Sequence, residues 1–393
     1  MKSWVDISGA RLGENLRAIQ SATGTAVEVL AVVKANGYGH DAALCAPVLV
    51  AAGARWLGVS DVEEGARVRE TLGESSTRLL VMCGMALADA PEMALHGLTP
   101  VVWTSEQVGA MERAARGAGH RLNVHLEIDT GMARQGALPG PELALVLERL
   151  AASRWVGCEG VMSHLCAAEV AGSEITERQR ERFAEALEQV TAAGIKPDYI
   201  HLGNSSAVDE GSTMAWVRDT AKKMGAKPMV RTGLAIYGSC LPIEGATSSA
   251  KKGRQAVRSG LAARLKPAMT WKTRILDLRE IEDGATVGYG AIFTAKGPMR
   301  LALLPVGYAD GFRREASSGL GNGWVMIGGE KSPVVGRVSM NLTVVDVTSR
   351  PNVTVGGEAV LLGEGVSVED HAAWCETIPY DILCGIKAKF TLR

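Results

Sequence analysis

Residues Leu30 to His40 read LAVVKANGYGH, an apolar run that delivers a lysine, Lys34, to turn-forming residues. An apolar run of this length that ends in glycine and asparagine is typical of a buried strand in a parallel sheet. Lys34 would then stand at the carboxyl end of the strand, where α/β folds place their active sites. A desolvated lysine there can form a Schiff base or abstract a proton, although a lysine at a strand end can also simply reach solvent.

Similar apolar runs recur from residue 28 to residue 240, with helical patterns between them. The eight candidate strands are 27–33, 56–60, 78–83, 98–103, 122–128, 156–162, 198–202 and the segment 230–238. Three intervening helices have starts that fit a capping box: Asp61 with Glu64, Thr104 with Gln107, and Thr176 with Gln179. Eight strands that each precede a helix predict a (β/α)8 barrel, and a doubly wound open sheet is the competing topology.

The pattern changes after the last of these strands. Residues 241–262 are small, polar and partly basic, which is typical of a linker. Short β-branched runs separated by glycine and proline follow, and these predict an all-β domain. We therefore expect an α/β chain with a TIM-type barrel over 1–240, a linker over 241–262 and a C-terminal all-β domain over 263–393.

Composition narrows the possible partners. The chain has 42 basic and 43 acidic residues, and this balance argues against nucleic acid as a partner. It contains no apolar run long enough to span a membrane, and its first residues do not form a signal peptide. The seven cysteines form no CxxC pair, which favours free thiols in a reducing compartment. We expect a cytoplasmic protein that binds neither nucleic acid nor membrane.

Candidate site residues lie at the carboxyl ends of four predicted strands. Asp129 and Arg134 follow one strand, and Ser163 and His164 follow the next. Asn204 and Ser205 follow the strand that contains His201, and Arg231 lies near the last strand, shortly before Gly233. Hydroxyl, amide and glycine groups beside two arginines can hold a phosphate and a carboxylate. Each residue alone is explained as well by a core histidine or a turn, so only their shared position at one end of a barrel favours a site. No zinc signature occurs, and we expect no metal site.

In the C-terminal part, Tyr289 stands between Gly288 and Gly290 in the run VGYG. A tyrosine framed by glycines can lie on a tight turn where the backbone approaches a ligand. An ordinary hairpin tyrosine would explain the same run.

Several longer motifs occur along the chain in a fixed order: AVVKANGYGH, DTGMARQG, MSHL, HLGNSS, VRTGLAIYG, VGYGAIFTA, LPVGYADG, VGRVSMN and IPYDIL. In these motifs and their order, the chain resembles the pyridoxal-phosphate-dependent alanine racemases over essentially its whole length. The resemblance implies a homodimeric enzyme that interconverts L- and D-alanine by a two-base mechanism and supplies D-alanine to the cell wall.

The resemblance also implies the catalytic residues. Lys34 would hold the pyridoxal phosphate covalently and act as one base, and Tyr289 would be the other base, supplied across the dimer interface. Arg231 would face the pyridine nitrogen, with His201 behind it. His164 would lie beside the cofactor ring and assist Tyr289.

Binding residues are implied in the same way. Arg134 would contact the cofactor's phenolic oxygen and the substrate carboxylate, and Tyr308, Met340 and Asn341 would belong to the substrate site and its entrance. The cofactor, and its phosphate above all, would be held by Tyr38, Asn204, Ser205, Tyr380 and the backbone around Gly233 and Leu234.

Two positions depart from the usual pattern of this family. Glu127 stands where many relatives have a lysine that becomes carbamylated, and its carboxylate could orient Arg134 without that modification. Asn341 stands where a typical alanine racemase has aspartate, and some relatives of broad specificity share the SMN triplet. The substrate range therefore stays open at this point.

Three alternatives to an alanine racemase follow. A racemase that accepts serine or other amino acids would share all these motifs. A decarboxylase of the same architecture would have a carboxylate at the pyridine nitrogen, whereas this chain has Arg231 there. A non-catalytic carrier of pyridoxal phosphate would lack the second domain and Tyr289.

Overall fold

The computed structural model describes residues 2–245 and 260–393. They form two compact units. The barrel unit consists of Leu12–Gly37 and Cys45–Lys266, and the β unit consists of Met1–Arg11, Tyr38–Leu44 and Pro267–Arg393. Most of the expected linker, 241–262, lies outside the described residues.

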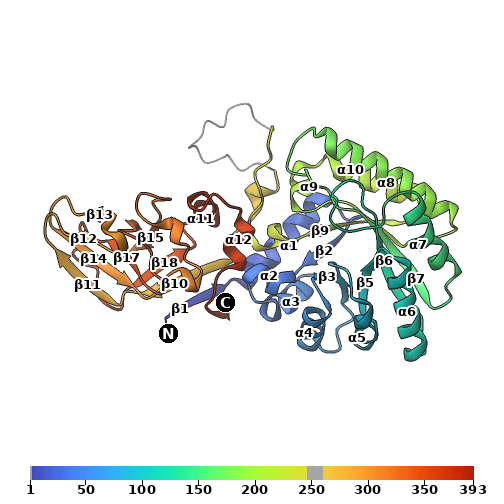
Figure 1. Ribbon diagram of the computed structural model, residues 1–393, viewed down its shortest axis with the longest axis horizontal. Helices are drawn as coiled ribbons and strands as arrows, with labels where there is room; N and C mark the ends of the chain where they lie inside the picture. The colour runs from blue at the N-terminus through green and yellow to red at the C-terminus, as the bar shows by residue number, and fades with distance from the viewer. Residues whose placement is uncertain (1, 246–259) are drawn as a thin grey trace. The chain divides into compact units, whose positions relative to one another are not determined.

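The barrel unit contains a closed ring of parallel strands (Figure 1). Its strands, each joined to the next, are β2 (Glu28–Val32), β3 (Trp56–Val59), β4 (Arg78–Val81), β5 (Leu98–Val102), β6 (Leu122–Glu127), β7 (Val156–Met162), β8 (Tyr199–His201) and β9 (Lys227–Thr232). β9 pairs back with β2, where Glu28 lies opposite Met229. The predicted barrel is therefore confirmed, and the open sheet is excluded because an open sheet has no such closing pair.

Helices connect these strands, and their starts test the predicted caps. They are α1 (Gly9–Thr23), α2 (Lys34–Gly39), α3 (Ala42–Ala51), α4 (Val62–Leu72), α5 (Ala90–Leu95), α6 (Ser105–Ala118), α7 (Pro141–Ala152), α8 (Glu174–Ala192), α9 (Ser205–Glu210) and α10 (Ser212–Lys223). Thr104 and Gln107 form the predicted capping box of α6, and Asp61 caps α4 by accepting a hydrogen bond from the Glu64 amide. The cap predicted at Thr176 is wrong, because Ser173 caps α8 and Thr176 is already inside the helix.

The described residues of the β unit form mainly antiparallel sheets and two short helices. Its largest sheet has the order β16 (Glu330–Pro333), β15 (Trp324–Ile327), β18 (Glu358–Leu362), β10 (Met269–Arg274), β1 (Ser3–Ile7) and β19 (Lys389–Leu392), and among the described strands of the unit only β1 and β19 pair in parallel. A second sheet joins β11 (Asp277–Ile281), β14 (Met299–Leu304) and β17 (Thr343–Asp346), and a third pairs β12 (Thr286–Val287) with β13 (Phe293–Thr294). Helices α11 (Val368–Trp374) and α12 (Pro379–Cys384) complete the unit. The predicted β domain is confirmed, and β1 joins it from the start of the chain.

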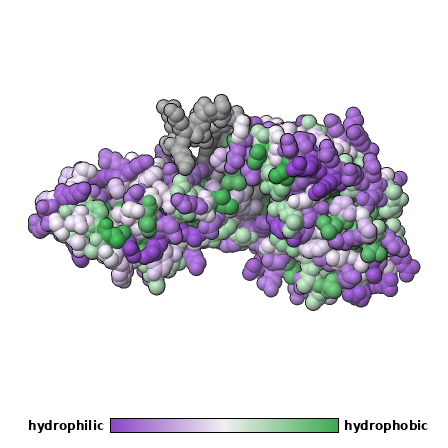
Figure 2. All heavy atoms as spheres, turned by 45° about the horizontal axis from the view of Figure 1, so that its top comes forward, coloured by the Kyte–Doolittle hydropathy of each residue, from purple (hydrophilic) through white to green (hydrophobic). Residues whose placement is uncertain are grey.

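Hydrophilic residues cover most of one face of the molecule (Figure 2). On the face shown in Figure 2, hydrophilic side chains predominate and hydrophobic ones form small separate groups. Among residues 2–245 and 260–393, no helix is both long enough and apolar enough to cross a membrane.

His371 on α11 makes the stability of the fold depend on pH. Its ring is buried against Phe312 and Trp374, and Nε2 lies 2.7 Å from the carbonyl oxygen of Leu361 on β18. Burial lowers the pKa of His371 from 6.5 to about 4, although the Leu361 carbonyl and Asp370 act in the opposite direction. Between these values the unfolded chain binds a proton that the folded chain does not, so the free energy of unfolding falls as the pH is lowered from 6.5 towards 4.

We therefore predict that replacing His371 with glutamine weakens the acid sensitivity of the fold. Glutamine keeps an N–H donor for Leu361 but does not titrate. The loss of Tm between about pH 7 and about pH 5 should be smaller in His371→Gln than in the wild type. Equal losses in the two proteins would show that His371 does not contribute.

Candidate active site

Lys34 lies at the carboxyl end of β2, as predicted, and begins an unusual turn. Residues 35–39 all have positive φ, including 52° at Ala35, 52° at Asn36 and 51° at Tyr38, so this turn is left-handed. Left-handed backbone costs roughly 1–2 kcal/mol for each residue that is not glycine. Part of that cost is offset by Glu64, whose Oε1 accepts a hydrogen bond of 2.8 Å from the Asn36 amide. The turn therefore holds the backbone that follows Lys34 in a strained but fixed conformation.

Arg231 projects from β9 into the interior of the barrel. Its Nη2 donates to the carbonyl oxygen of Ser163 at 2.7 Å and lies 3.1 Å from Nδ1 of His164. Burial lowers the pKa of Arg231 to about 10, while Glu127 raises it. Its Nε and Nη1 are buried and have no hydrogen-bond partner among the described residues. Nε and Nη1 of Arg231 are therefore donors that a bound acceptor could satisfy.

His164 lies in the loop after β7 and is surrounded by positive charge. Its pKa is lowered to about 3 by burial first, and then by Arg231, Arg134 and Lys34. Since Nδ1 accepts from Arg231, the neutral ring carries its proton on Nε2. The positive charges of Lys34, Arg134 and Arg231 all act on His164, so these three predicted site residues lie within electrostatic reach of it.

Arg134 follows a tight turn after β6. The carboxylate of Asp129 accepts hydrogen bonds of 2.8, 2.9 and 3.1 Å from the amides of Gly131, Met132 and Ala133, and the side chain of Arg134 is exposed. Three amides on one carboxylate oxygen fix this loop. The turn therefore fixes the backbone position of Arg134, while its exposed side chain can contact a ligand.

Glu127 lies at the end of β6, next to a neutral amide. Its Oε2 accepts a hydrogen bond of 2.5 Å from the side chain of Gln135. Burial raises the pKa of Glu127, and Gln135, Arg231 and Arg134 all act to lower it. Glu127 thus lies among the site cations, but its hydrogen bond is to an amide.

A second group of predicted residues lies between β8 and β9. Asn204 caps α9 by accepting from the Ala207 amide at 3.0 Å. The hydroxyl oxygen of Ser205 accepts from the amides of Gly233 at 3.2 Å and Ala235 at 3.3 Å. Ser205 and the backbone after β9 are therefore close together, as predicted.

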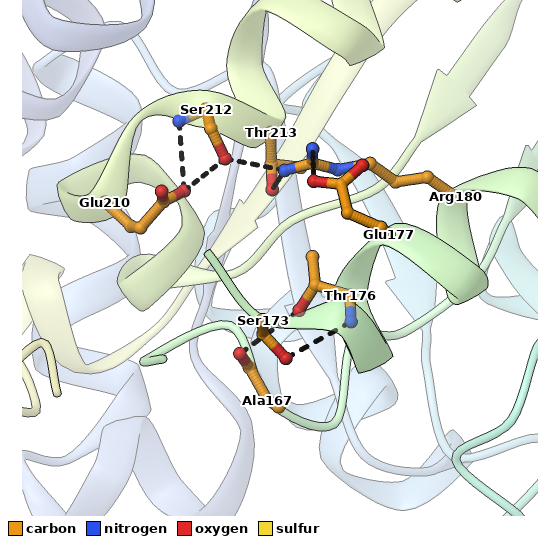
Figure 3. A network of polar contacts seen from close by, with 8 residues as sticks. All are labelled: Ala167, Ser173, Thr176, Glu177, Arg180, Glu210, Ser212 and Thr213. Atoms are coloured by element: carbon orange, nitrogen blue, oxygen red, sulfur yellow. Dashed lines mark hydrogen bonds and ion pairs between the residues drawn. The ribbon is translucent and has the colours of Figure 1, made fainter. Parts of the chain in front are cut away.

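A polar network steadies the far end of α9. Arg180 of α8 reaches Ser212 and Thr213 at the start of α10, at 2.7 and 2.8 Å, and also pairs with Glu177 (Figure 3). Ser212 in turn donates to the carboxylate of Glu210 at the end of α9. The helix that begins at Ser205 is thus held at both ends.

Gln179 is a member of the site that the sequence did not reveal. It was expected to cap a helix, but its Nε2 donates to the carbonyl oxygen of His164 at 2.9 Å and to Thr130 at 3.2 Å. Its Oε1 accepts from the Cys166 amide at 3.0 Å. Gln179 therefore fixes the backbone around His164. The sequence does contain one signal of this role, because Gln179 lies beside Phe183 on the apolar face of α8.

The remaining predicted residues belong to the β unit. The rings of Tyr38 and Tyr380 lie 5.7 Å apart. Tyr289 is 72% exposed on a turn in which a Cβ at Gly288 would lie 3.1 Å from the Arg337 amide nitrogen.

Tyr308 and Met340 occupy neighbouring backbone segments of the same unit. The Tyr308 amide donates to the Ser339 carbonyl oxygen at 3.1 Å, and the Ala309 amide donates to that of Met340 at 2.9 Å. Tyr308 is 42% exposed, Met340 is 55% exposed, and Asn341 beside them is exposed as well. The β unit thus presents four predicted functional side chains at its surface, counting Tyr289.

Comparison with known proteins identifies the family of the chain. Residues 7–240 match the family described as "Alanine racemase, N-terminal domain", and residues 268–393 match "Alanine racemase, C-terminal domain". An alanine racemase of Symbiobacterium thermophilum is 34% identical over 391 residues, which cover 98% of this chain and 95% of the relative.

Solved structures give the same answer. The alanine racemase of Streptomyces lavendulae, a producer of D-cycloserine, has a TM-score of 0.86 at 28% identity and covers 100% of this chain and 97% of its own. The alanine racemase of Bartonella henselae with covalently bound pyridoxal phosphate has a TM-score of 0.82 at 25% identity, with both chains covered over 100% of their length. This chain belongs to the alanine racemase family.

Proposed function

We propose that this protein is a pyridoxal-phosphate-dependent racemase that interconverts L-alanine and D-alanine. Within the structure, the observation that carries the proposal is the buried Arg231 near the carboxyl end of β9, whose Nε and Nη1 have no hydrogen-bond partner in the described part of the chain. The reaction is inferred from the family to which the chain belongs.

The residues present fit the cofactor. A buried N–H group without a partner is costly, and an unprotonated pyridine nitrogen is the acceptor that would satisfy Nε or Nη1 of Arg231. Lys34 stands at the same end of the barrel and within electrostatic reach of His164. We assign Lys34 to the covalent bond with the cofactor's aldehyde carbon and Arg231 to its ring nitrogen.

The phosphate group would be held by short side chains and amides. We assign Asn204, Ser205, Gly233 and Leu234 of the barrel unit, and Tyr38 and Tyr380 of the β unit, to this task. The support is that the hydroxyl of Ser205 lies 3.2 and 3.3 Å from the backbone nitrogens of Gly233 and Ala235, so a hydroxyl group and the backbone after β9 are side by side. Hydroxyl and backbone N–H groups are donors suited to a phosphate. The left-handed turn that follows Lys34 includes Tyr38, so the lysine and this tyrosine share one fixed segment.

Racemisation needs proton transfer on both faces of the α-carbon. When bound, pyridoxal phosphate supplies an electron sink that stabilises negative charge on that carbon. Lys34 would move the proton on one face and Tyr289 would move it on the other. Because Arg231 can only donate hydrogen bonds, it would favour an unprotonated ring nitrogen, and this would moderate the sink and favour prompt return of the proton to the α-carbon.

Tyr289 needs help to act as a base. Ionising an ordinary tyrosine at neutral pH costs roughly 4 kcal/mol, which neighbouring donors or cations must offset. We assign His164 to this task, since its neutral ring carries a proton on Nε2.

Substrate recognition would combine charge with an entrance in the β unit. Arg134 is exposed on its loop, and we assign it to the substrate carboxylate and to the cofactor's phenolic oxygen. Tyr308, Met340 and Asn341 would line the approach. A racemase that also accepts serine is the second candidate, because Asn341 departs from the aspartate typical of alanine racemases.

We further propose a cytoplasmic homodimer that provides D-alanine for the cell wall. The barrel domain, 1–240, would bind the cofactor, and the β domain, 263–393, would give Tyr289 to the partner. Support comes from the exposure of Tyr289, Tyr308 and Met340, since exposed aromatic and methionine side chains are enriched where proteins associate.

The reaction is tested with a panel of amino acids. The purified protein with pyridoxal phosphate should abolish the optical activity of L-alanine, and the panel decides how far serine and others follow. A protein that binds the cofactor but leaves every amino acid unchanged would refute the proposed reaction. Release of carbon dioxide would indicate a decarboxylase instead.

Replacing Tyr289 with phenylalanine should separate binding from catalysis. The variant should retain pyridoxal phosphate, because Lys34 and Arg231 are untouched, and should lose most racemisation, because one proton-transfer group is gone. Cofactor absorbance and the rate of racemisation measure the two effects. Full activity in Tyr289→Phe would contradict the two-base mechanism.

Replacing Glu127 with glutamine should weaken substrate binding. The change removes a negative charge that interacts with Arg231 and Arg134 but keeps the size of the side chain. We expect KM for alanine to rise about fivefold, the effect of roughly 1 kcal/mol. Gln135→Ala, which removes only the neutral partner, serves as the comparison, and unchanged kinetics in Glu127→Gln would refute a role for its charge.

A further inference from the structure

The barrel interior beyond Arg231 is polar, where barrels of this type are usually filled with branched apolar side chains. His201, His125 and Glu159 are all buried there, and Arg78 reaches them from the start of β4. Replacing buried ions by apolar residues is often neutral or stabilising, so stability alone does not account for this composition. We name these four residues the polar column.

The column begins with a paired carboxylate. Arg78 donates from Nη1 and Nη2 to the two oxygens of Glu159 at 2.8 and 2.7 Å, and its guanidinium lies 4.5 Å from the centre of the Trp56 ring. Oε2 of Glu159 is 3.5 Å from Nε2 of His125. Burial acts to raise the pKa of Glu159, but its contacts with His125 and Arg78 outweigh this effect and hold the pKa below its ordinary value. Glu159 is therefore a charged acceptor.

A β-bulge on β7 makes this arrangement possible. Val124 pairs with Cys158 and the next residue, His125, pairs with Gly160, so Glu159 is an extra residue in the strand. Glu159 and Gly160 consequently both face the interior instead of alternating. A Cβ at Gly160 would lie 2.7 Å from Nδ1 of His125 and 2.8 Å from Nε2 of His201, so glycine leaves the space that these two rings occupy.

The two imidazoles meet edge to face. Their ring centres are 4.7 Å apart at an angle of 88°, and His201 lies within electrostatic reach of Arg231. Nδ1 of His125 and Nε2 of His201 border the same small space beside Gly160. The column thus runs from Arg78 through Glu159, His125 and His201 to Arg231.

Unpaired donors and acceptors are concentrated along this path. Both ring nitrogens of His125 and of His201, together with Nε and Nη1 of Arg231, are buried and lack a hydrogen-bond partner among the described residues. Arginine only donates and a carboxylate only accepts. If the two imidazoles between them are neutral, only one arrangement of their protons gives each successive contact a donor and an acceptor. In that arrangement Nε2 carries the proton and Nδ1 is bare on both rings, so that His201 donates to His125 and His125 donates to Glu159.

We propose that His125 and Glu159 are positioning residues for Arg231. By fixing the tautomers of both histidines, Glu159 makes Nδ1 of His201 an acceptor for one Arg231 donor, and the other donor is left for the cofactor's ring nitrogen. Burial lowers the pKa values of His125 and His201, which agrees with two neutral rings. The role in catalysis rests on the proposed racemase function, whereas the tautomers do not.

The tautomers are tested first, on the wild type. Imidazole ¹⁵N NMR of the protein loaded with pyridoxal phosphate, without substrate, should show His125 and His201 protonated on Nε2 only and unchanged from about pH 6 to about pH 9. Loss of single resonances in His125→Phe and His201→Phe assigns the signals. A proton on Nδ1, or titration of either ring in this range, would overturn the proposal even if the enzyme racemises alanine.

The catalytic consequence is tested with a matched pair of variants. Glu159→Gln removes the charged acceptor of the column. Glu28→Gln is the control, because it removes the carboxylate of an ion pair outside the column, in which Glu28 lies 2.7 Å from Arg55, the residue before β3. Glu159→Gln should lower kcat about tenfold, as expected when a buried polar group loses its partner, and leave KM within about twofold.

The absorption band of the bound cofactor should also shift in Glu159→Gln and stay as in the wild type in Glu28→Gln. Unchanged kcat and absorption in a folded Glu159→Gln protein would overturn the role of Glu159, as would an equal loss in Glu28→Gln. If the wild type racemises no amino acid, the proposed function fails, and the NMR result still decides whether the column exists.

Discussion

The burial of the Arg231 guanidinium determines the chemistry of its surroundings. A positive charge inside a barrel must find acceptors, and the Ser163 carbonyl and the Nδ1 of His164 provide two. Glu127 stabilises the charge from a greater distance. Burial is the largest cause that lowers the pKa values of His164 and His201, and the positive charge of Arg231 acts in the same direction on both. Burial and one buried cation together thus favour neutral histidines around Arg231.

The closed barrel makes this concentration of polar groups possible. Parallel strands of a barrel deliver their carboxyl ends to one mouth, so residues far apart in sequence, such as Lys34, His164 and Arg231, become neighbours. The supports are also drawn from different segments: Gln179 on α8 holds the His164 backbone, and the Arg180 network holds the helix that begins at Ser205 (Figure 3). Rigid elements therefore position the groups that would have to meet a cofactor within narrow limits.

The eight barrel strands, the β domain and the position of Lys34 could be predicted because hydrophobic periodicity and turn residues are local signals. Three features could not. Nothing local marks the bulge that turns Glu159 inward, since it depends on register with β6. Gln179 fits a capping box in sequence, yet tertiary hydrogen bonds and Ser173 decide its role. The left-handed turn after Lys34 contradicts the propensity of Ala35 and Tyr38, and is maintained by surrounding contacts such as that from Glu64.

The two proposed bases require unlike environments. Lys34 follows a buried strand and is within reach of several fixed charges, whereas Tyr289 lies 72% exposed on a glycine turn of the other unit. An exposed tyrosine interacts mainly with water, whereas proton transfer at a carbon is favoured in a site from which water is excluded. Tyr289 would meet that requirement only where another surface covers the glycine turn. This is the physical reason for the homodimer proposed above, because a partner's surface would cover the turn and place the base.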